Sequence, residues 1–154
     1  MPEHYSLGLI GFPLGHSLSP VLHQTALSEA RLTGKYELFT VPPQPEGQKD
    51  LEGLLNRLRS GDLQGLNVTI PHKQSVFTLV DALTPSAAAM GAVNTLYMRS
   101  GQLVGDNTDA PGFWGDLSHL PIQNAKSALI LGAGGAARAV VYALLTRGWT
   151  VRIT

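Results

Sequence analysis

The feature that most constrains the fold of this chain is the alternation of short strand-like and helix-like stretches along its 154 residues. Residues 6–11, 36–41 and 65–70 are short, mainly apolar runs bounded by turn-forming residues, which is typical of buried strands. Segments with helical patterning separate these runs. The alternation therefore predicts an α/β protein with a mostly parallel open sheet and flanking helices.

Helix signals lie in the segments between the expected strands. The clearest amphipathic helix carries four leucines at i, i+3, i+4 and i+7 within residues 51–58, and Gly61 ends it. Ser19 and Thr84 are each followed by proline, which predicts a hydroxyl N-cap before a helix. The helix after Ser19 should reach about residue 32. A further helix is expected to open at Pro71 and continue to Leu83, because its apolar residues recur at helical spacing.

The second half of the chain predicts a hairpin and then a second, smaller domain. The hairpin joins residues 93–98 to 102–105, and a helix is expected from about Ala110. The two expected domains are residues 1–121 and residues 122–154. Within the second domain we expect a strand at 127–131, a helix at 134–147 and a strand at 149–153. This last part is an incomplete Rossmann β-α-β unit, which cannot bury its own faces. We therefore expect an N-terminal fragment whose exposed second domain favours self-association.

Composition excludes several classes of protein. The chain has 11 basic and 11 acidic residues, so its net charge is zero, which argues against nucleic acid or acidic membranes as partners. It contains no cysteine, so neither a disulfide framework nor a thiolate metal site is possible. The start lacks the cationic segment of a signal peptide, and the apolar runs are shorter than the roughly 18 residues of a membrane span. A cytoplasmic location is expected.

A glycine-rich run follows the strand at 127–131 and opens the next helix. It consists of Gly132, Ala133, Gly134, Gly135 and Ala136. In this context small residues let the backbone approach a pyrophosphate, and the helix N-terminus stabilises its negative charge. We expect these residues to bind a dinucleotide cofactor. The residue that selects NAD or NADP belongs about 20 positions further on, at or beyond Thr154, so these residues leave that choice open.

Polar side chains cluster after several of the expected strands. In an open α/β sheet, ligands bind beyond the carboxyl ends of the strands. The candidates come from four segments, and they are Ser17, Ser19, Asn67, Thr69, Lys73, Asn94 with its neighbour Thr95, and Asp109. Short hydroxyl and amide side chains suit a small polyhydroxylated ligand, and Lys73 suits a carboxylate or carbonyl oxygen. No metal site is expected, since His4, His23 and His119 show no ligand grouping.

Each of these residues also has a purely structural interpretation. Ser19 and Asp109 can be helix caps, and the two asparagines can be turn residues that bond to their own backbone. Lys73 can be a solvated surface lysine. His16 and His72 are expected to be packed or hydrogen-bonded loop histidines. Taken one at a time, these residues do not decide between the two interpretations.

The order and spacing of the motifs favour the functional interpretation of these polar residues over the structural one, because the chain resembles the shikimate dehydrogenase family. The stretches that carry the resemblance are residues 11–20, 67–73, 91–95, 107–113 and 132–139, in the family's order. The resemblance implies reduction of 3-dehydroshikimate to shikimate with NADPH. It also implies that Ser17 and Ser19 bind the substrate carboxylate.

The resemblance assigns roles to the remaining candidates. Asn67, Thr69, Asn94 and Asp109 would hold the ring hydroxyls, Lys73 and Asp109 would form the catalytic pair, and Gly132 to Ala136 would cradle the pyrophosphate of NADP. Hydride transfer to a ketone develops negative charge on its oxygen, and Lys73 can neutralise it by donating a proton. Asp109 would favour the charged lysine and orient it.

Two alternatives remain open from the sequence. One is a related dehydrogenase that acts on quinate, whose motifs would be almost the same. The other is a non-catalytic fragment that binds shikimate. Because family members continue for roughly as many residues again, we expect the 154-residue chain alone to be inactive and its NADP site to be incomplete.

Overall fold

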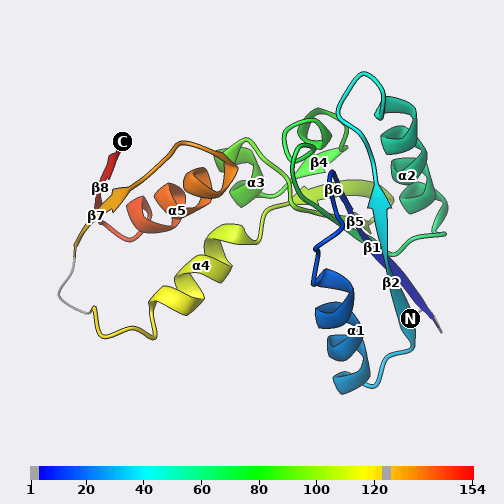
Figure 1. Ribbon diagram of the computed structural model, residues 1–154, viewed down its shortest axis with the longest axis horizontal. Coiled ribbons are helices and arrows are strands. Elements are labelled where there is room, and N and C mark those ends of the chain that lie inside the picture. The colour runs from blue at the N-terminus through cyan, green and yellow to red at the C-terminus, as the bar shows by residue number, and fades with distance from the viewer. Residues whose placement is uncertain (1–3, 123–125) are drawn as a thin grey trace.

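The computed structural model describes residues 4–122 and 126–154 (Figure 1). Within these residues eight strands occur: β1 (Tyr5–Gly11), β2 (Gly34–Thr40), β3 (Gly65–Val68), β4 (Ala82–Leu83), β5 (Thr95–Arg99), β6 (Gln102–Asp106), β7 (Ser127–Ile130) and β8 (Thr150–Ile153). The same residues form five α-helices and one 3₁₀ helix: α1 (Ser19–Glu29), α2 (Gln48–Ser60), η1 (Val76–Thr78), α3 (Pro85–Met90), α4 (Asp109–Leu117) and α5 (Gly135–Leu145). We call residues 4–122 the first region and residues 126–154 the second region.

The strands of the first region form one open sheet in the order β2-β1-β3-β5-β6-β4. β1 pairs in parallel with β2 and β3, and β4 pairs in parallel with β6. β5 is antiparallel to both of its neighbours, β3 and β6. Every strand of this sheet except β5 therefore runs in one direction, which confirms the predicted α/β fold with a mostly parallel sheet.

Helices α1 and α2 cover opposite faces of this sheet, as the side chains of β2 show. Tyr36 stacks on His23 of α1, with ring centroids 4.2 Å apart. Phe39 lies under the guanidinium group of Arg57 of α2, at 5.4 Å. An even and an odd position of one strand point to opposite faces. The predicted amphipathic helix at residues 51–58 is confirmed within α2, whose four leucines are buried in the main core.

The helix expected from Pro71 to Leu83 does not form. This segment makes consecutive turns, the short 3₁₀ helix η1 and then the strand β4. β4 pairs with β6, and the backbone N–H of Asp81 donates to the carbonyl of Leu103. Val76 is fully buried, so the apolar pattern does mark core positions. Pairing with the sheet therefore overrides the helical spacing.

The other local signals of the first region have mixed outcomes. Thr84 caps α3, since its hydroxyl accepts a hydrogen bond from the backbone N–H of Ala87. The β5–β6 hairpin is confirmed, and Ser100 and Gly101 at its turn both have positive φ angles, 52° and 78°. Ser19 is not the N-cap of α1, because the helix begins at Ser19 itself and Leu18 holds the cap position.

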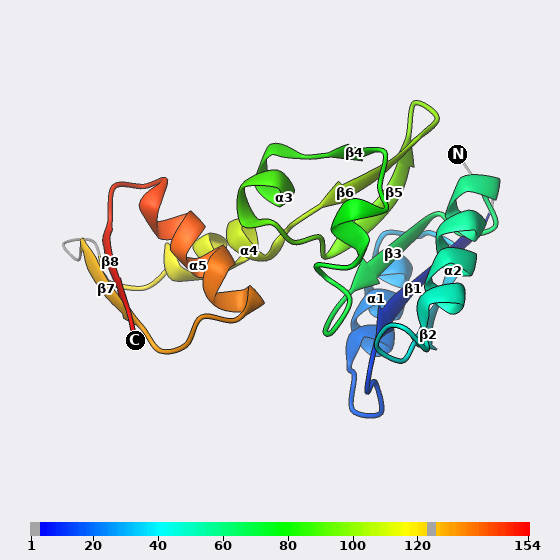
Figure 2. The same cartoon turned by 90° about the horizontal axis from the view of Figure 1, so that it is seen from above.

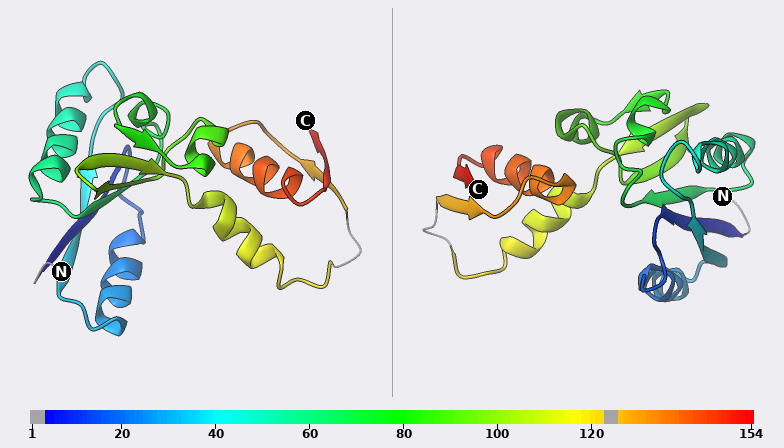
Figure 3. Two further views of the ribbon diagram at one scale, coloured as in Figure 1. Left: turned by 180° about the vertical axis from the view of Figure 1, so that it is seen from behind. Right: turned by 45° about the horizontal axis from the view of Figure 1, so that its top comes forward.

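The second region contains the parallel pair β7–β8 with α5 between them in sequence. This is the predicted β-α-β arrangement. Figures 2 and 3 show α5 beside α4. Ala139 and Ala143 of α5 pack with Met90 of α3 and Ala110 of α4 in a small core cluster. The expected division at residues 121 and 122 falls beside residues 123–125, which lie outside the described residues, and it stays a prediction.

The part of the chain that the structure describes contains no helix long and apolar enough to cross a membrane.

Candidate functional site

The predicted polar residues converge at one edge of the six-stranded sheet. β1, β3 and β6 end at this edge, and the antiparallel strand β5 begins there. Asn94 precedes β5, and its backbone is joined to both neighbours: its carbonyl accepts from Val68 and its N–H donates to Asp106. The reversal of β5 therefore places a residue from the start of one strand among residues from the ends of the others.

Lys73 and Asp109 form an ion pair at this edge. The Nζ atom of Lys73 lies 2.6 Å from Oδ2 of Asp109, and the two side chains are 21% and 33% exposed. The backbone carbonyl of Lys73 also accepts from the N–H of Val93, which ties its loop to the segment before β5. Lys73 is therefore a paired, partly shielded cation rather than a solvated surface lysine.

The second oxygen of Asp109 is held by Asn94. The Nδ2 atom of Asn94 donates to Oδ1 of Asp109 at 2.7 Å. The backbone N–H of Asp109 also donates to Oδ1 of Asn107 at 3.0 Å. Asp109 is the first residue of α4 and Thr108 is at the cap position, so the carboxylate faces Lys73 and Asn94 instead of capping the helix.

Asn67 lies within β3, and its side chain bonds to other segments instead of to its own backbone. Its Oδ1 atom accepts a hydrogen bond of 2.8 Å from the hydroxyl of Tyr36, which comes from β2. Its Nδ2 atom lies 3.4 Å from the hydroxyl of Thr95. Burial raises the pKa of Tyr36 to about 12, an effect that the nearby Ser19 partly offsets. The side chains of both asparagines are therefore held by bonds to other segments of the chain, and neither acts as a turn residue bonded to its own backbone.

Ser17, Ser19 and Thr69 line a hollow of about 340 Å³ at the end of β1. The Oγ atom of Ser17 accepts from the backbone N–H of Ser19 at 3.3 Å. Thr69 is tied to β1 through its backbone N–H, which donates to Ile10. All three hydroxyl residues thus come to one place beside the polar cluster, as the sequence predicts.

Histidines near the site behave differently from one another. His72 is 1% exposed, and its Nε2 atom lies 2.7 Å from the carbonyl oxygen of Val41, so the expected buried and bonded histidine is confirmed there. This contact ties the loop that carries Lys73 to the end of β2. His16, by contrast, is exposed and lines the hollow beside Ser17.

Tyr36 is the site residue that sequence reasoning missed. It lies in the middle of a strand, and it is 8% exposed, like a core residue. An aromatic residue in a strand is usually taken as packing, and its local sequence gives no sign of the hydroxyl's partner. A weak signal in the sequence is that Tyr36 lies between two charged residues, Lys35 and Glu37, so its ring points to the opposite side of the strand from theirs.

The glycine-rich run forms the turn between β7 and α5. Gly132 has a φ of 101°, which favours glycine, and its N–H donates to the carbonyl of Thr154. Gly134 precedes α5, whose first N–H groups have no helical partners. A Cβ atom built on Gly134 or Gly135 would meet no atom of the described chain within 4 Å. The run therefore has the space and the donors that a pyrophosphate needs.

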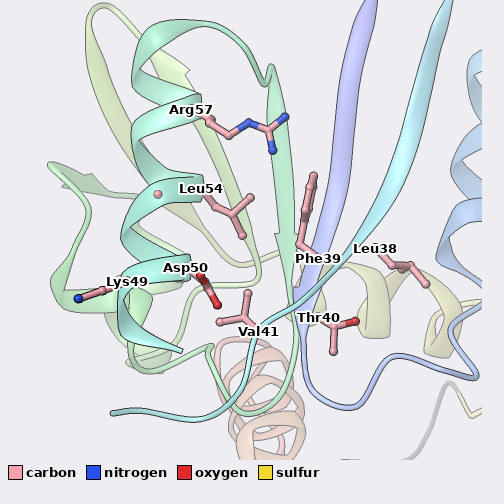
Figure 4. Close-up of a pocket in the computed structure, with 9 residues that line it drawn as sticks. Leu38, Phe39, Thr40, Val41, Lys49, Asp50, Leu54 and Arg57 are labelled. Carbon is pink, nitrogen blue, oxygen red and sulfur yellow. The ribbon is translucent and has the colours of Figure 1, made fainter. Parts of the chain in front are cut away.

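Another hollow, of about 470 Å³, lies between β2 and α2 (Figure 4). Figure 4 shows Lys49, Asp50 and Arg57 of α2 on one side, and Phe39 and Thr40 of β2 on the other. Arg57 is engaged with the Phe39 ring. None of the predicted site residues lines this hollow. The predicted substrate-binding residues gather instead at the sheet edge described above, and we call them the strand-end cluster: Ser17, Ser19, Asn67, Thr69, Lys73, Asn94 and Asp109.

Comparison with known proteins gives a consistent result. A family model described as the shikimate dehydrogenase substrate binding domain matches residues 9–96. The NADP(+) shikimate dehydrogenase of Oleidesulfovibrio alaskensis is 48% identical over 141 residues, which cover 92% of this chain and 48% of that protein.

Two solved structures are similar over nearly the whole chain. Shikimate dehydrogenase from Aquifex aeolicus superposes with a TM-score of 0.86 at 38% identity, over 99% of this chain and 56% of that one. The enzyme from Thermus thermophilus in complex with NADP(H) and shikimate gives 0.84 at 38% identity, over 97% and 55%. The chain thus spans about half the length of the relatives it matches.

Proposed function

The chain belongs to the shikimate dehydrogenase family, and from this premise we propose that it carries the substrate site of an NADP-dependent shikimate dehydrogenase. The reaction is the reversible reduction of 3-dehydroshikimate to shikimate, a step of aromatic amino acid biosynthesis. The observation that carries the proposal is the Lys73–Asp109 pair, 2.6 Å apart, at a sheet edge lined with amide and hydroxyl groups. A cation paired this way suits a reaction in which an oxygen gains negative charge.

Substrate binding divides between two groups of side chains in this proposal. Ser17 and Ser19 donate hydrogen bonds to the carboxylate from the hollow at the end of β1. Thr69, Asn67 and Asn94 hold the ring hydroxyls. Ser19 is the first residue of α1, and its side chain lies within hydrogen-bonding reach of Tyr36, which supports its placement near the site.

Catalysis in this proposal depends on a proton held at one atom. The Nζ atom of Lys73 donates a proton to the ketone oxygen as negative charge develops on it. Asp109 orients the Nζ group of Lys73 by accepting its hydrogen bond at Oδ2, while Asn94 holds Oδ1. In the direction of shikimate oxidation the same lysine, left neutral, accepts the hydroxyl proton. Both partners are more than half shielded, which strengthens their interaction relative to bulk water.

NADP would be held at the turn between β7 and α5 by Gly132, Ala133, Gly134, Gly135 and Ala136. The open space at Gly134 and Gly135 and the free N–H groups of α5 support this assignment. When bound, the nicotinamide supplies or accepts the hydride. The protein contributes position and charge, through the residues of the first region described above.

Three further assignments belong to this proposal. Residues 1–121 form the substrate domain and residues 122–154 begin the Rossmann domain. The protein works in the cytoplasm, which the absence of cysteine from all 154 residues supports. The second region favours self-association through apolar side chains such as Leu129 and Leu131, which are 65% and 79% exposed.

Calorimetric titration of the 154-residue chain with shikimate tests the proposal. We expect weak binding that Ser17→Ala lowers by roughly tenfold or more, because the lost hydrogen bond is to a charged carboxylate. Ser28→Ala, an exposed serine of α1, is the matched control and should leave binding unchanged. Shikimate methyl ester should bind as poorly to the wild-type chain as shikimate binds to the Ser17 variant.

Two results would decide against the proposal or its substrate. A wild-type chain that takes up no shikimate at millimolar concentration contradicts it. Tighter binding of quinate than of shikimate keeps the site but changes the substrate to the related cyclic acid.

A further inference from the structure

Tyr36 lies at the start of a hydrogen-bonded series that ends at the Lys73–Asp109 pair. Its ring is stacked on His23 with an angle of 3° between the planes, so the ring position is fixed. Its hydroxyl donates to Oδ1 of Asn67 at 2.8 Å. The bonds that Asn67 donates through Nδ2 are longer, 3.4 Å to Thr95 and 3.5 Å to the Asn94 carbonyl.

The series continues from Asn67 to the carboxylate. The hydroxyl of Thr95 donates to Oδ1 of Asn94 at 2.8 Å. The Nδ2 atom of Asn94 then donates to Oδ1 of Asp109 at 2.7 Å. Tyr36, Asn67, Thr95, Asn94 and Asp109 come from β2, β3, β5, the segment before β5, and α4. The series therefore links β2, β3 and β5, of which β2 and β3 are separated by β1, to the Lys73–Asp109 pair.

The direction of every bond in this series follows from its last member. An ionised carboxylate only accepts, so the amide group of Asn94 must turn its NH₂ toward Asp109. Its oxygen then faces Thr95, whose hydroxyl must donate to it. The lone pairs of Thr95 are left to accept from Nδ2 of Asn67.

The bond directions of the first two members, Tyr36 and Asn67, follow from that of Thr95. With Nδ2 of Asn67 toward Thr95, its Oδ1 faces Tyr36, and the tyrosine hydroxyl must be the donor. A hydroxyl can donate only while it is protonated. Burial raises the pKa of Tyr36 to about 12, so the hydroxyl remains a donor throughout the neutral range.

We propose that Tyr36 is a positioning residue for substrate binding, which sets the orientation of the Asn67 amide so that its NH₂ group faces a substrate hydroxyl. This inference rests on the proposed function. The 2.8 Å bond from Tyr36 is the shortest that the Asn67 side chain makes, whereas its own donations are long enough for a substrate oxygen to replace them. Thr95 is the relay that keeps the orientation of Asn67 consistent with that of Asn94.

The test is Tyr36→Phe in the 154-residue chain, with two readouts. Shikimate affinity should fall by about threefold to tenfold, the effect of one lost hydrogen bond. The side-chain amide signals of Asn67 in a ¹H–¹⁵N spectrum should also shift, with or without shikimate. Tyr5→Phe, at the opposite end of the sheet, is the matched control and should change neither readout.

Substitution of the relay separates orientation from packing. Thr95→Ser keeps the hydroxyl and should bind shikimate within about twofold of the wild-type chain, whereas Thr95→Val should lose as much as Tyr36→Phe. Equal losses in the serine and valine variants would overturn the proposal, and so would a Tyr36→Phe variant that binds normally. If the wild-type chain fails to bind shikimate, the proposed function fails, and the Asn67 signals still decide the inference: unchanged signals in Tyr36→Phe overturn it.

Discussion

The first and second regions of this chain bury their apolar side chains to very different extents. The main core of the first region packs one face of the six-stranded sheet against α2, and residues such as Leu58 and Leu96 are 0% exposed. In the second region Leu129, Leu131 and Ile153 are 65%, 79% and 53% exposed. The described part of that region has a two-stranded sheet, and such a sheet is marginal by itself.

The difference extends to the polar groups. In the first region the site side chains are fixed by bonds between segments far apart in sequence, such as Lys73 with Asp109 and Tyr36 with Asn67. In the second region the glycine turn has open space at Gly134 and Gly135, and the first N–H groups of α5 have no helical partners. The proposed substrate site thus consists of side chains tied to the sheet edge by long-range bonds, whereas the proposed cofactor turn lies in a region with fewer buried side chains.

The largest expected effect is the loss of activity on substitution of Lys73, which tests whether the proton donor lies in the first region. In a chimera that continues this chain with the C-terminal half of the Thermus thermophilus enzyme, Lys73→Ala should lower kcat by roughly 10²- to 10⁴-fold. KM for shikimate should change much less, since the lysine acts mainly as charge develops. Lys49→Ala, on α2, is the control and should retain full activity. A near-normal kcat with a greatly raised KM would make Lys73 a binding residue only.

The next effect concerns stability in the two regions. Leu58→Ala should lower the free energy of unfolding by about 2–5 kcal/mol, because it opens a cavity in the main core. Leu129→Ala should change it by no more than about 0.5 kcal/mol, because that side chain is exposed. Urea unfolding followed by fluorescence measures both. Equal losses in the two variants would remove the contrast between the regions.

Hydrogen exchange should show the same contrast without a substitution. Amides of β1 and β3 should exchange only through global unfolding, whereas those of β7 and β8 should exchange through local opening, which has a lower free energy. The reason is that, within the described strands, no residue of β7 or β8 is buried, whereas four residues of β1 and two of β3 are. Protection factors in β7 that equal those in β1 would show that the second region is as cooperative as the first.

A smaller effect concerns acid stability within the first region. Hydrogen bonds from Arg59, and then from the N–H of Leu103, hold the pKa of Asp81 below its usual value near 3.8. A lowered pKa stabilises the fold above the pKa of the unfolded chain, and this contribution is lost as pH falls through the lower folded value. Asp81→Asn should therefore flatten the fall in Tm below about pH 4.

The effect of Asp81 is expected to be the smallest because its partner Arg59 is more than a third exposed. Asp116→Asn in α4 is the control. A Tm curve of Asp81→Asn that falls as steeply as the wild-type curve would show that the pair does not titrate with folding.

Comparison of sequence and structure shows where patterns succeed and where they fail. The leucines of α2 and the proline-flanked cap at Thr84 depend on neighbours within a few residues, so local spacing predicts them. The helix expected to start at Pro71 is wrong because β4 pairs with β6, a partner more than 20 residues away. Local spacing contains no information about that pairing.

The residues of the site were likewise predictable from the sequence only in part. Polar residues at strand ends were predictable because parallel strands share an edge, and Lys73, Asn94 and Asp109 do meet there. The capping interpretation of Ser19 is wrong because α1 begins one residue earlier than that interpretation needs. The contact of Tyr36 could not be predicted, because the partner of its hydroxyl, Asn67, lies 31 residues away on another strand.

The central claim is that substrate recognition is confined to the strand-end cluster of the first region. A shikimate titration followed by ¹H–¹⁵N spectra of the 154-residue chain tests it most directly. We predict saturable shifts at Ser17, Asn67 and Asn94, with the amides of β7 and β8 unchanged. Shifts centred on β7 and β8, or on the hollow between β2 and α2 at Phe39 and Arg57, would contradict it.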